Sequence, residues 1–260
     1  MITSASNKKV KDIIQLTQKA KERRVRDLFV VEGTKMFLEA PTERIEQVFV
    51  SSAFLLNAGE MILNKLHETD YEEVADDVFK KMSDTQTPQG ILCTIKQFHY
   101  QFEDLFQEKG LYILLESLQD PGNLGTIFRT AEGAGINGII MSSDTVDLYN
   151  PKTIRSTMGS IYRMPHLYTE DLLQMISKLK EQGITVYAAH LKGERYYDAF
   201  DYQKGSAFLI GNEGNGLKKE TAEKASTYLK IPMEGKLESL NAAVSAAILM
   251  YEAHRQRSNS

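Results

Sequence analysis

The residues best suited to binding an anion follow the apolar run 112–115 of this 260-residue chain. Residues 119–131 read Gln-Asp-Pro-Gly-Asn-Leu-Gly-Thr-Ile-Phe-Arg-Thr-Ala, which predicts a loop or N-cap position for Asn123 and a helix that carries Arg129. Arginine offers phosphate a planar fork of donors, and a helix N-terminus adds amide donors. The two residues lie six positions apart, so they reach one substrate only if Asn123 precedes the helix. The alternative roles are a plain helix cap for Asn123 and a surface ion pair for Arg129.

A glycine-rich stretch, residues 210–241, is the second candidate for a binding site. Gly211, Gly214 and Gly216 fall within six residues, directly after the apolar run 207–210. Glycine lets another group approach the backbone closely, and loops at the carboxyl ends of parallel strands are frequent ligand sites. A second strand-like run, 227–231, ends at Pro232 and a further glycine-bearing loop. We therefore expect two strand ends to converge on one pocket.

Several familiar sites are excluded by the order or spacing of their residues. Residues 133–138 match the dinucleotide pattern G-x-G-x-x-G, but a predicted helix precedes them and a predicted strand follows. The mechanism of that motif needs the opposite order, so we interpret residues 133–138 as a helix-to-strand turn. The chain has no P-loop and no G-x-S-x-G motif, and its five histidines lack metal-ligand spacing. We expect no metal, and we expect each histidine to be a surface or core residue.

The elements that position these residues form two alternating series of helices and strands. The first has strands at 28–31, 45–50 and 91–95, and helices at 8–20, 32–38 and 53–66 with another ending at 82. The second has strands at 112–115, 136–141, 184–189, 207–210 and 227–231, and helices at 124–134, 151–158, 171–180, 217–224 and 240–256. This order predicts an α/β fold with a mostly parallel sheet in the second series. The domains expected are 1–96 and 110–260, with a polar linker at 97–109.

Composition and charge narrow the class of protein. Hydrophobic residues make up 42% and charged residues 25%, with no apolar run long enough for a membrane span and no signal peptide. A single cysteine, Cys93, suits a reducing cytoplasm and is expected to be a buried hydrophobe. Residues 1–30 hold eight basic and three acidic residues, a balance of +5 within a chain of net charge −4. This basic region either follows a phosphate backbone or is a solvated helix face.

Three motifs in order resemble those of the SpoU (TrmH) family, the RNA ribose 2'-O-methyltransferases of the SPOUT superfamily. They are the segments 123–131, 210–217 and 231–241. The segment 150–159, Asn-Pro-Lys-x-x-Arg-x-x-Met-Gly, also resembles part of that family, and the similarity spans roughly 109–257. Residues 1–95 resemble the ribosomal-protein-like α/β substrate-binding domain that often precedes the catalytic domain.

The resemblance implies a deep trefoil knot in the C-terminal segment, S-adenosylmethionine bound within the knot loops, and no metal. It assigns cofactor contacts to Gly211, Ile231 and Leu240, with Ala189 at the end of a third strand. Arg129 is the reactive residue of the family motif, where it has been proposed as the base. A guanidinium rarely loses its proton, so a phosphate clamp and alkoxide stabiliser is the better role. The residues implied to position ribose, phosphate and Arg129 are Asn123, Glu213, Ser239 and Asn241.

The family resemblance also implies a homodimer, because its cofactor pocket and RNA groove combine elements of two subunits. The small residues of the closing helix 240–256 are consistent with close packing against a second copy. Ribosomal RNA is favoured as the substrate because the N-terminal module resembles that of ribosomal RNA enzymes. A tRNA 2'-O-methyltransferase, a non-catalytic RNA-binding protein, and a small-molecule or protein methyltransferase on the same fold are the alternatives. The target nucleotide and any part in antibiotic resistance are left open.

Overall fold

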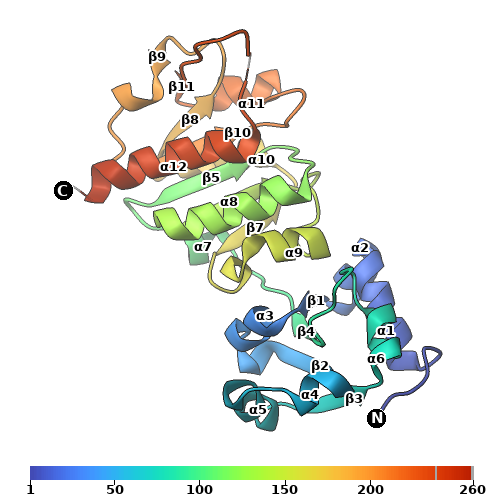
Figure 1. Ribbon diagram of the computed structural model, residues 1–260. Helices are drawn as coiled ribbons and strands as arrows, with labels where there is room; N and C mark the ends of the chain where they lie inside the picture. Colours follow the sequence, from blue (N-terminus) through green and yellow to red (C-terminus); the bar gives the residue numbers. More distant parts are fainter. Residues whose placement is uncertain (238, 259–260) are drawn as a thin grey trace. The chain divides into compact units, whose positions relative to one another are not determined.

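A computed structural model describes residues 1–237 and 239–258, which form two compact units (Figure 1). Unit 1 contains Met1–Phe98 and Asp147–Tyr162, and unit 2 contains His99–Val146 and Arg163–Ser260. The units therefore interleave along the chain, whereas the domains expected from the sequence, 1–96 and 110–260, are each continuous. The segment Asp147–Tyr162 packs with the N-terminal unit although its sequence resembles the methyltransferase family.

Unit 1 is a small mixed sheet with helices packed on it. The strand order is β1-β4-β2-β3, with β4 antiparallel to β1 and β2, and β3 parallel to β2. Cys93 lies fully buried in β4, as expected, and burial raises the pKa of its thiol to about 12. The strands are β1 (Leu28–Glu32), β2 (Ile45–Ser51), β3 (Tyr71–Val74) and β4 (Ile91–Lys96), and the helices are α1 (Lys8–Gln18), α2 (Ala20–Arg26), α3 (Thr34–Glu39), α4 (Ser52–Leu56), α5 (Glu60–His67), α6 (Asp76–Met82) and α9 (Pro151–Thr157), with 3-10 turns at Thr42–Arg44 and Ser160–Tyr162.

Two helices expected in this unit are each broken in two. The helix predicted at 8–20 ends at Gln18, because Lys19 is extended (φ −121°, ψ 112°), and α2 then starts at Ala20. The helix predicted at 53–66 is interrupted by residues 57–59, and Gly59 becomes the N-cap of α5. Strand β3 was not anticipated, since its four residues include two glutamates.

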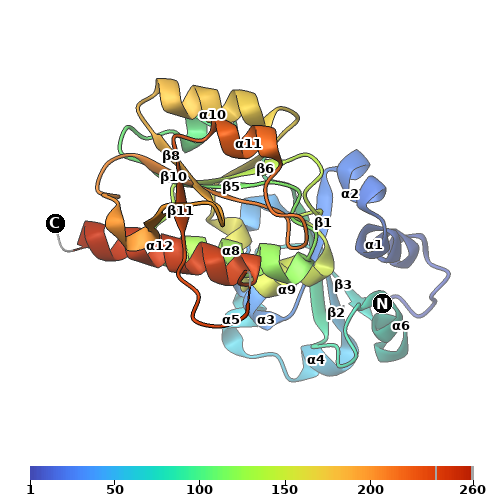
Figure 2. The same ribbon diagram turned by 90° about the horizontal axis from the view of Figure 1, so that it is seen from above.

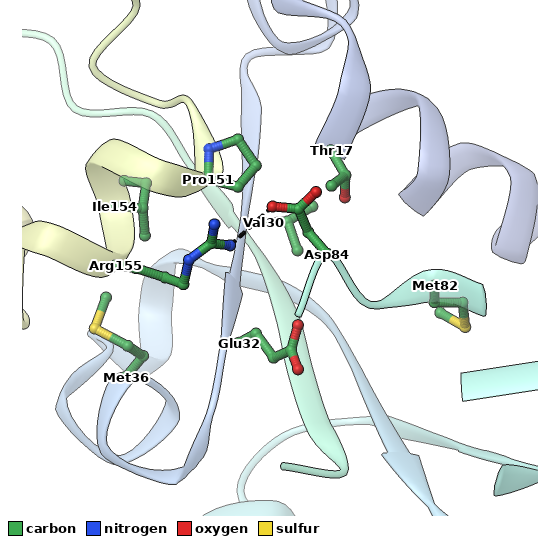
Figure 3. Close-up of a pocket in the computed structure, with 9 residues that line it drawn as sticks. All are labelled: Thr17, Val30, Glu32, Met36, Met82, Asp84, Pro151, Ile154 and Arg155. Atoms are coloured by element: carbon green, nitrogen blue, oxygen red, sulfur yellow. Dashed lines mark hydrogen bonds and ion pairs between the residues drawn. The ribbon is translucent and has the colours of Figure 1, made fainter. Parts of the chain in front are cut away.

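The segment Asp147–Tyr162 is held in unit 1 by polar and aromatic contacts. Arg23 is only 3% exposed and donates from Nε and Nη2 to Asp147 Oδ2 at 2.9 and 2.7 Å. The ring of Tyr149 lies 4.6 Å from that of Phe29. Figure 3 shows Arg155 of α9 pointing toward Asp84, and their ion pair measures 2.9 Å. Unit 1 is thus completed by residues 147–162, which follow the first methyltransferase motif in the sequence.

Unit 2 is a seven-stranded parallel sheet between two layers of helices. The strand order is β7-β6-β5-β10-β8-β11-β9, and each adjacent pair is parallel. Helices α8 and α12 lie on one face, with α10 and α11 on the other (Figure 2). The strands are β5 (Leu111–Leu115), β6 (Gly138–Ser142), β7 (His166–Thr169), β8 (Thr185–Ala189), β9 (Arg195–Tyr196), β10 (Ser206–Ile210) and β11 (Thr227–Lys230), and the helices are α7 (Phe102–Leu105), α8 (Pro121–Ala134), α10 (Leu172–Glu181), α11 (Lys219–Lys224) and α12 (Ala242–Ser258), with a 3-10 turn at Tyr197–Ala199.

Alternating side chains of the central strands fill the space under each helix layer. Tyr112 and Leu114 of β5 pack with residues of α10 and α7, while the intervening Ile113 points to the opposite face and is also fully buried. Helix α7 includes Phe102 and Leu105 of this core, so the segment 97–109 contains ordered, buried structure. Burial on both faces explains why β5 and β10 are almost wholly apolar.

The segment around the first motif differs from expectation at one important point. Helix α8 begins at Pro121, not at residue 124, because the side chain of Asp120 caps it by accepting from Asn123 N at 2.7 Å. Asn123 is therefore a residue of the first helical turn. At the other end, Gly135 adopts φ +73° as the C-cap and β6 starts at Gly138. The helix-to-strand turn expected at 133–138 is confirmed.

The α/β class and the parallel second sheet are confirmed, while the trefoil knot stays a prediction. Among the described residues, no helix is both long and apolar enough to cross a bilayer. Strands β7 and β9 were not anticipated, because β7 carries polar residues at a sheet edge and β9 has only two residues.

A buried histidine gives unit 2 a specific acid sensitivity. His166 is 3% exposed, and its Nδ1 lies 2.9 Å from the carbonyl oxygen of Met164, so Nδ1 carries the proton that is donated. Burial lowers the pKa of His166 to about 4. The folded chain thus keeps this ring neutral at pH values where an exposed histidine is protonated.

Replacing His166 with asparagine, which retains a donor near the Nδ1 position, should weaken this acid sensitivity. Between pH 6.5 and 4 the unfolded wild type binds a proton that the folded state does not, so stability falls as the pH falls. The lowered pKa of His166 corresponds to a loss of roughly 3 kcal/mol at the low end of this window. Urea unfolding at several pH values measures this loss of stability. Parallel pH profiles for wild type and His166→Asn would contradict a neutral buried ring.

Candidate active site

The glycine-rich loop joins β10 to α11 at the carboxyl edge of the parallel sheet. A Cβ built on Gly211 would lie 2.3 Å from the carbonyl carbon of Gly216 and 2.4 Å from Leu217 N. No side chain fits there, so position 211 requires glycine. The loop closes on itself through Asn212 N to Gly216 O at 3.0 Å and Gly216 N to Asn212 O at 2.9 Å. The start and end of the loop therefore lie against each other backbone to backbone.

Asn212 connects this loop to the end of β5. Its Oδ1 accepts from the amides of Gly214 and Asn215 at 2.9 and 3.0 Å, and its Nδ2 donates to Ser117 O at 2.8 Å. Ser117 has φ +55°, and its hydroxyl donates to Asp144. Hydrogen bonds from Ser117 and Ser142 hold the pKa of Asp144 below its usual range. The loops after β5, β6 and β10 are thus tied together by side-chain hydrogen bonds.

Glu213 links the first motif to the glycine-rich loop by hydrogen bonds. Its carboxylate accepts from the backbone amides of Gln119 and Asp120, both at 3.1 Å, and from Asn123 Nδ2 at 3.0 Å. Burial alone would raise the pKa of Glu213, but hydrogen bonds from the Asn123 side chain and from these two amides outweigh it. The pKa of Glu213 is consequently lowered. The carboxylate is an acceptor for three donors.

Asn241 completes this cluster from the third motif. Its Nδ2 donates to Asn123 Oδ1 at 2.9 Å, and its Oδ1 accepts from the amides of Ala243 and Val244 at the start of α12. Because Glu213 can only accept, Asn123 must present Nδ2 to it and Oδ1 to Asn241. The orientation of both amides follows from the carboxylate. Residues 118 positions apart in the chain are joined in one directed hydrogen-bond chain.

A cavity of about 310 Å³ opens beside this cluster, at the ends of β8, β10 and β11. It is lined by glycine backbone and aliphatic side chains, with Glu213 and Lys230 as its charged residues. Six of the nine residues expected to form the site lie in this lining: Ala189, Gly211, Glu213, Ile231, Ser239 and Leu240. Asn123 joins them through its hydrogen bond to Glu213, and Asn241 joins them through its hydrogen bond to Asn123. The predicted convergence of two strand ends on one pocket is confirmed.

Arg129 is the predicted residue that the structure leaves apart. It lies six residues after Asn123 on the same helix, so the two side chains leave α8 about 120° apart. Arg129 is exposed, does not line the cavity, and forms no hydrogen bond or ion pair with residues in the described part of the chain. Its guanidinium is therefore available to a group from outside the chain.

His190 lines the cavity although no motif selects it. It follows β8 directly, its ring stacks on Tyr228 at 4.9 Å, and its Nδ1 accepts from Lys192 N at 3.0 Å. The proton of the neutral ring therefore sits on Nε2. The usable signal was its place immediately after a parallel strand, at the same edge as the glycine-rich loop.

A second cavity, in unit 1, is far smaller. The cavity in unit 1 drawn in Figure 3 has a volume of only about 20 Å³, which is room for about one water molecule. Within residues 1–237 and 239–258, no three His, Cys, Asp or Glu side chains gather as metal ligands would. The larger cavity is the candidate active site.

Comparison with known proteins assigns this architecture to a family. Residues 110–251 match the model of the SpoU rRNA Methylase family, and residues 7–93 match that of the MRM3-like substrate binding domain. The chain belongs to the SpoU family. RlmP of Bacillus subtilis, a 23S rRNA (guanosine(2553)-2'-O)-methyltransferase, is 34% identical over 252 residues, which cover 96% of this chain and 97% of RlmP.

Solved structures agree with this SpoU assignment. An AdoMet-bound rRNA methyltransferase from Sinorhizobium meliloti has a TM-score of 0.86 and 33% identity, covering 98% of this chain and 97% of its own. AviRb of Streptomyces viridochromogenes, in complex with AdoMet, has a TM-score of 0.88 over 98% of this chain and 99% of its own. At 23% identity AviRb supports the fold alone.

The SpoU cavity suits S-adenosylmethionine (AdoMet) in size and chemistry. Its volume lies at the lower end of the range for ligand pockets, about 300–1,000 Å³. Neutral backbone donors and acceptors at Gly211 and Ile231 match an adenine, and the aliphatic lining at Leu229 and Leu240 matches apolar parts of the cofactor. The lining contains no cluster of basic residues that would favour a nucleotide phosphate.

Asn123→Asp should lower the free energy of unfolding in a pH-dependent way that Asn123→Ala does not. Both lose the bond to Glu213, and alanine also loses the bond from Asn241, but only aspartate places a second carboxylate beside Glu213, at a cost of the order of 1 kcal/mol for this partly exposed pair. This cost should vanish in acid, where one carboxyl takes a proton and can donate to the other. Chemical unfolding of both variants at pH 7 and near pH 4 measures this change. A difference between the two variants that is the same at both pH values would contradict the assigned amide orientation.

Proposed function

We propose that this protein transfers the methyl group of S-adenosylmethionine to a ribose 2'-hydroxyl of large-subunit ribosomal RNA. The observation that carries the proposal is the directed chain Glu213–Asn123–Asn241, which unites all three family motifs beside a neutral cavity. The 23S rRNA specificity named for RlmP, which matches almost the whole chain, supports ribosomal RNA as the substrate. The proposal places the protein in the cytoplasm with its RNA.

Helices α1 and α2 are the proposed RNA-docking surface of unit 1. Three of the eight basic residues near the N-terminus form ion pairs within the unit: Lys9 with Glu72, Arg23 with Asp147, and Arg26 with Asp12 and Glu22. The other five are exposed and form no ion pair with any residue between 1 and 237 or 239 and 258: Lys8, Lys11, Lys19, Lys21 and Arg24. Unpaired lysine and arginine side chains on consecutive helices suit a phosphate backbone.

The chemistry requires a nucleophilic ribose oxygen held in line with the methyl group. S-adenosylmethionine supplies an electrophilic methyl group on a sulfonium, and Gly211, Ile231, Leu240 and Ala189 are the residues proposed to hold it. Glu213 is a poor base, because its pKa is lowered and three donors already occupy its oxygens. We assign Glu213, Asn123, Ser239 and Asn241 to positioning the ribose and its phosphate.

Arg129 is proposed to clamp a phosphate next to the target ribose and to stabilise the developing alkoxide. A guanidinium remains protonated, so it serves as a donor and not as the base. Since Arg129 points about 120° away from Asn123 on α8, we propose that it serves the cavity of a second subunit. The protein is then a homodimer. Val244 and Tyr251 of α12 are 47% and 49% exposed, and they provide apolar surface for that contact.

Loss of the protein should remove one 2'-O-methyl mark from large-subunit ribosomal RNA. Cells with and without the gene are compared by mapping 2'-O-methylation across total RNA, and the mutant is complemented with wild type or Arg129→Lys. Lysine lacks the bidentate fork, so we expect a fall in kcat of about 100- to 1,000-fold with unchanged cofactor affinity. A mark lost from tRNA instead would indicate that tRNA, and not ribosomal RNA, is the substrate. Cofactor binding without any lost mark would favour a non-catalytic RNA-binding protein, and full activity of Arg129→Lys would exclude the clamp.

Two inactive variants should restore activity when they share a dimer. Gly211→Val blocks one cavity, since any Cβ collides with Gly216, and Arg129→Lys removes one clamp. If Arg129 acts on the partner's cavity, a mixed dimer keeps one intact site, and refolding an equal mixture should recover about a quarter of wild-type activity. Refolding each variant alone is the control. No recovery in a mixture shown to contain mixed dimers, or an active wild-type monomer, would contradict the two-subunit site.

A further inference from the structure

We propose that Glu116 is a positioning residue that clamps both ends of the cofactor-binding loop. It is 3% exposed, follows β5 directly, and does not line the cavity. Neither its residue type nor its spacing marks it in the sequence, because its partners lie 102 and 105 positions away. The inference rests on the proposed function in one respect: the loop that Glu116 holds is taken to contact S-adenosylmethionine.

The first end of the loop is held by the main chain of Glu116. Its amide donates to the carbonyl oxygen of Ile210 at 2.9 Å, at the last residue of β10 and immediately before Gly211. This bond extends the parallel pairing of β5 and β10 by one step beyond the Leu115–Ile210 register. The backbone of residue 116 thus holds the position at which the chain leaves the sheet.

The second end is held by the side chain of Glu116. Oε2 accepts from the amide of Lys218 at 2.8 Å, and Oε1 accepts from the hydroxyl of Thr221. Lys218 is the N-cap of α11 and provides no side-chain cap for that helix. Glu116 thus supplies, from a distant strand, the acceptor that the N-terminus of α11 lacks locally. Thr221 is 2% exposed, so water does not replace this acceptor readily.

Two of these partners, Ile210 and Lys218, flank the backbone crossing, in which Gly211 lies against Gly216 and Leu217. The loop from Gly211 to Leu217 forms one wall of the cavity, and residue 211 touches 216 and 217 with no room for a side chain. Such a crossing keeps its shape only if the strand end and the helix start stay at a constant separation. Glu116 sets that separation from one residue, through its amide on one side and its carboxylate on the other.

The test is Glu116→Gln, read first by amide hydrogen exchange without cofactor. Glutamine can accept one hydrogen bond but turns an NH2 group toward the other donor. Loss of a hydrogen bond to a charged acceptor should speed exchange at residues 212–218 about 10- to 100-fold. The dissociation constant for S-adenosylmethionine and its KM should rise by a similar factor, while the KM for RNA stays constant. These readouts separate positioning of the loop from general stability.

Glu32→Gln is the matched control. Glu32, which is labelled in Figure 3, lies in unit 1, and its carboxylate accepts from the hydroxyls of Ser83 and Thr85. The same substitution there should leave exchange at 212–218 and cofactor affinity unchanged. Thr221→Val removes one donor to Glu116 and should give a smaller effect in the same direction, whereas Thr221→Ser keeps the hydroxyl and should behave as wild type.

The outcomes distinguish this inference from the proposed function. Faster exchange confined to 212–218, with weaker cofactor binding, supports the clamp. Unchanged exchange and affinity in Glu116→Gln, or a uniform rise in exchange over the whole of unit 2, would overturn it. If Glu116→Gln does not fold, the pair Thr221→Val and Thr221→Ser decides by the same two readouts. A wild type that shows the protected loop but binds no S-adenosylmethionine would refute the proposed function and leave the clamp intact.

Discussion

The backbone crossing at Gly211 is the constraint on which the candidate site depends. With a hypothetical Cβ only 2.3 Å from Gly216, the chain leaving β10 lies in direct contact with the chain entering α11. The wall of the cavity is therefore made of backbone whose position cannot be adjusted by side-chain rotamers. A neutral adenine bound by backbone donors and acceptors needs such a fixed wall, since a shift of the loop would displace all of them together. Asn212, through Ser117, and Glu116, through Lys218, both tie the loop to the end of β5 and oppose that shift.

The hydrogen-bond chain from Glu213 through Asn123 to Asn241 depends on the same loop. Glu213 reaches Gln119, Asp120 and Asn123 only because the crossing brings residue 213 to the carboxyl end of β5. A parallel sheet places the ends of β5, β8, β10 and β11 at one edge, and this topology explains why segments far apart in sequence supply one site. The carboxylate then determines both amide orientations, so one charged group sets the donor and acceptor pattern beside the cavity.

The sequence predicted the features that have local causes. The apolar runs of β5, β8 and β10 and the three motifs led to the cavity, because buried parallel strands and glycine-bearing loops leave strong patterns. Expectations failed where a distant partner decides the structure. Asn123 was expected to precede α8, but the Asp120 cap makes it helical. No sequence pattern marks Glu116, because its hydrogen-bond partners in β10 and α11 come close to it only in the folded chain. His190 was treated as filler for the same reason.

The helical position of Asn123 changes what the site requires. If Asn123 preceded α8, it and Arg129 could serve one substrate within a single subunit. With both on the helix, the two side chains diverge by about 120°, and Glu213 and Asn241 already hold Asn123 toward its own cavity. Arg129 must then act elsewhere or not at all. Helix α8, which carries this exposed arginine, packs against α12, whose Val244 and Tyr251 are also exposed, and these features fit a surface that a second copy would cover. A local cap thereby becomes an argument for a site built from two chains.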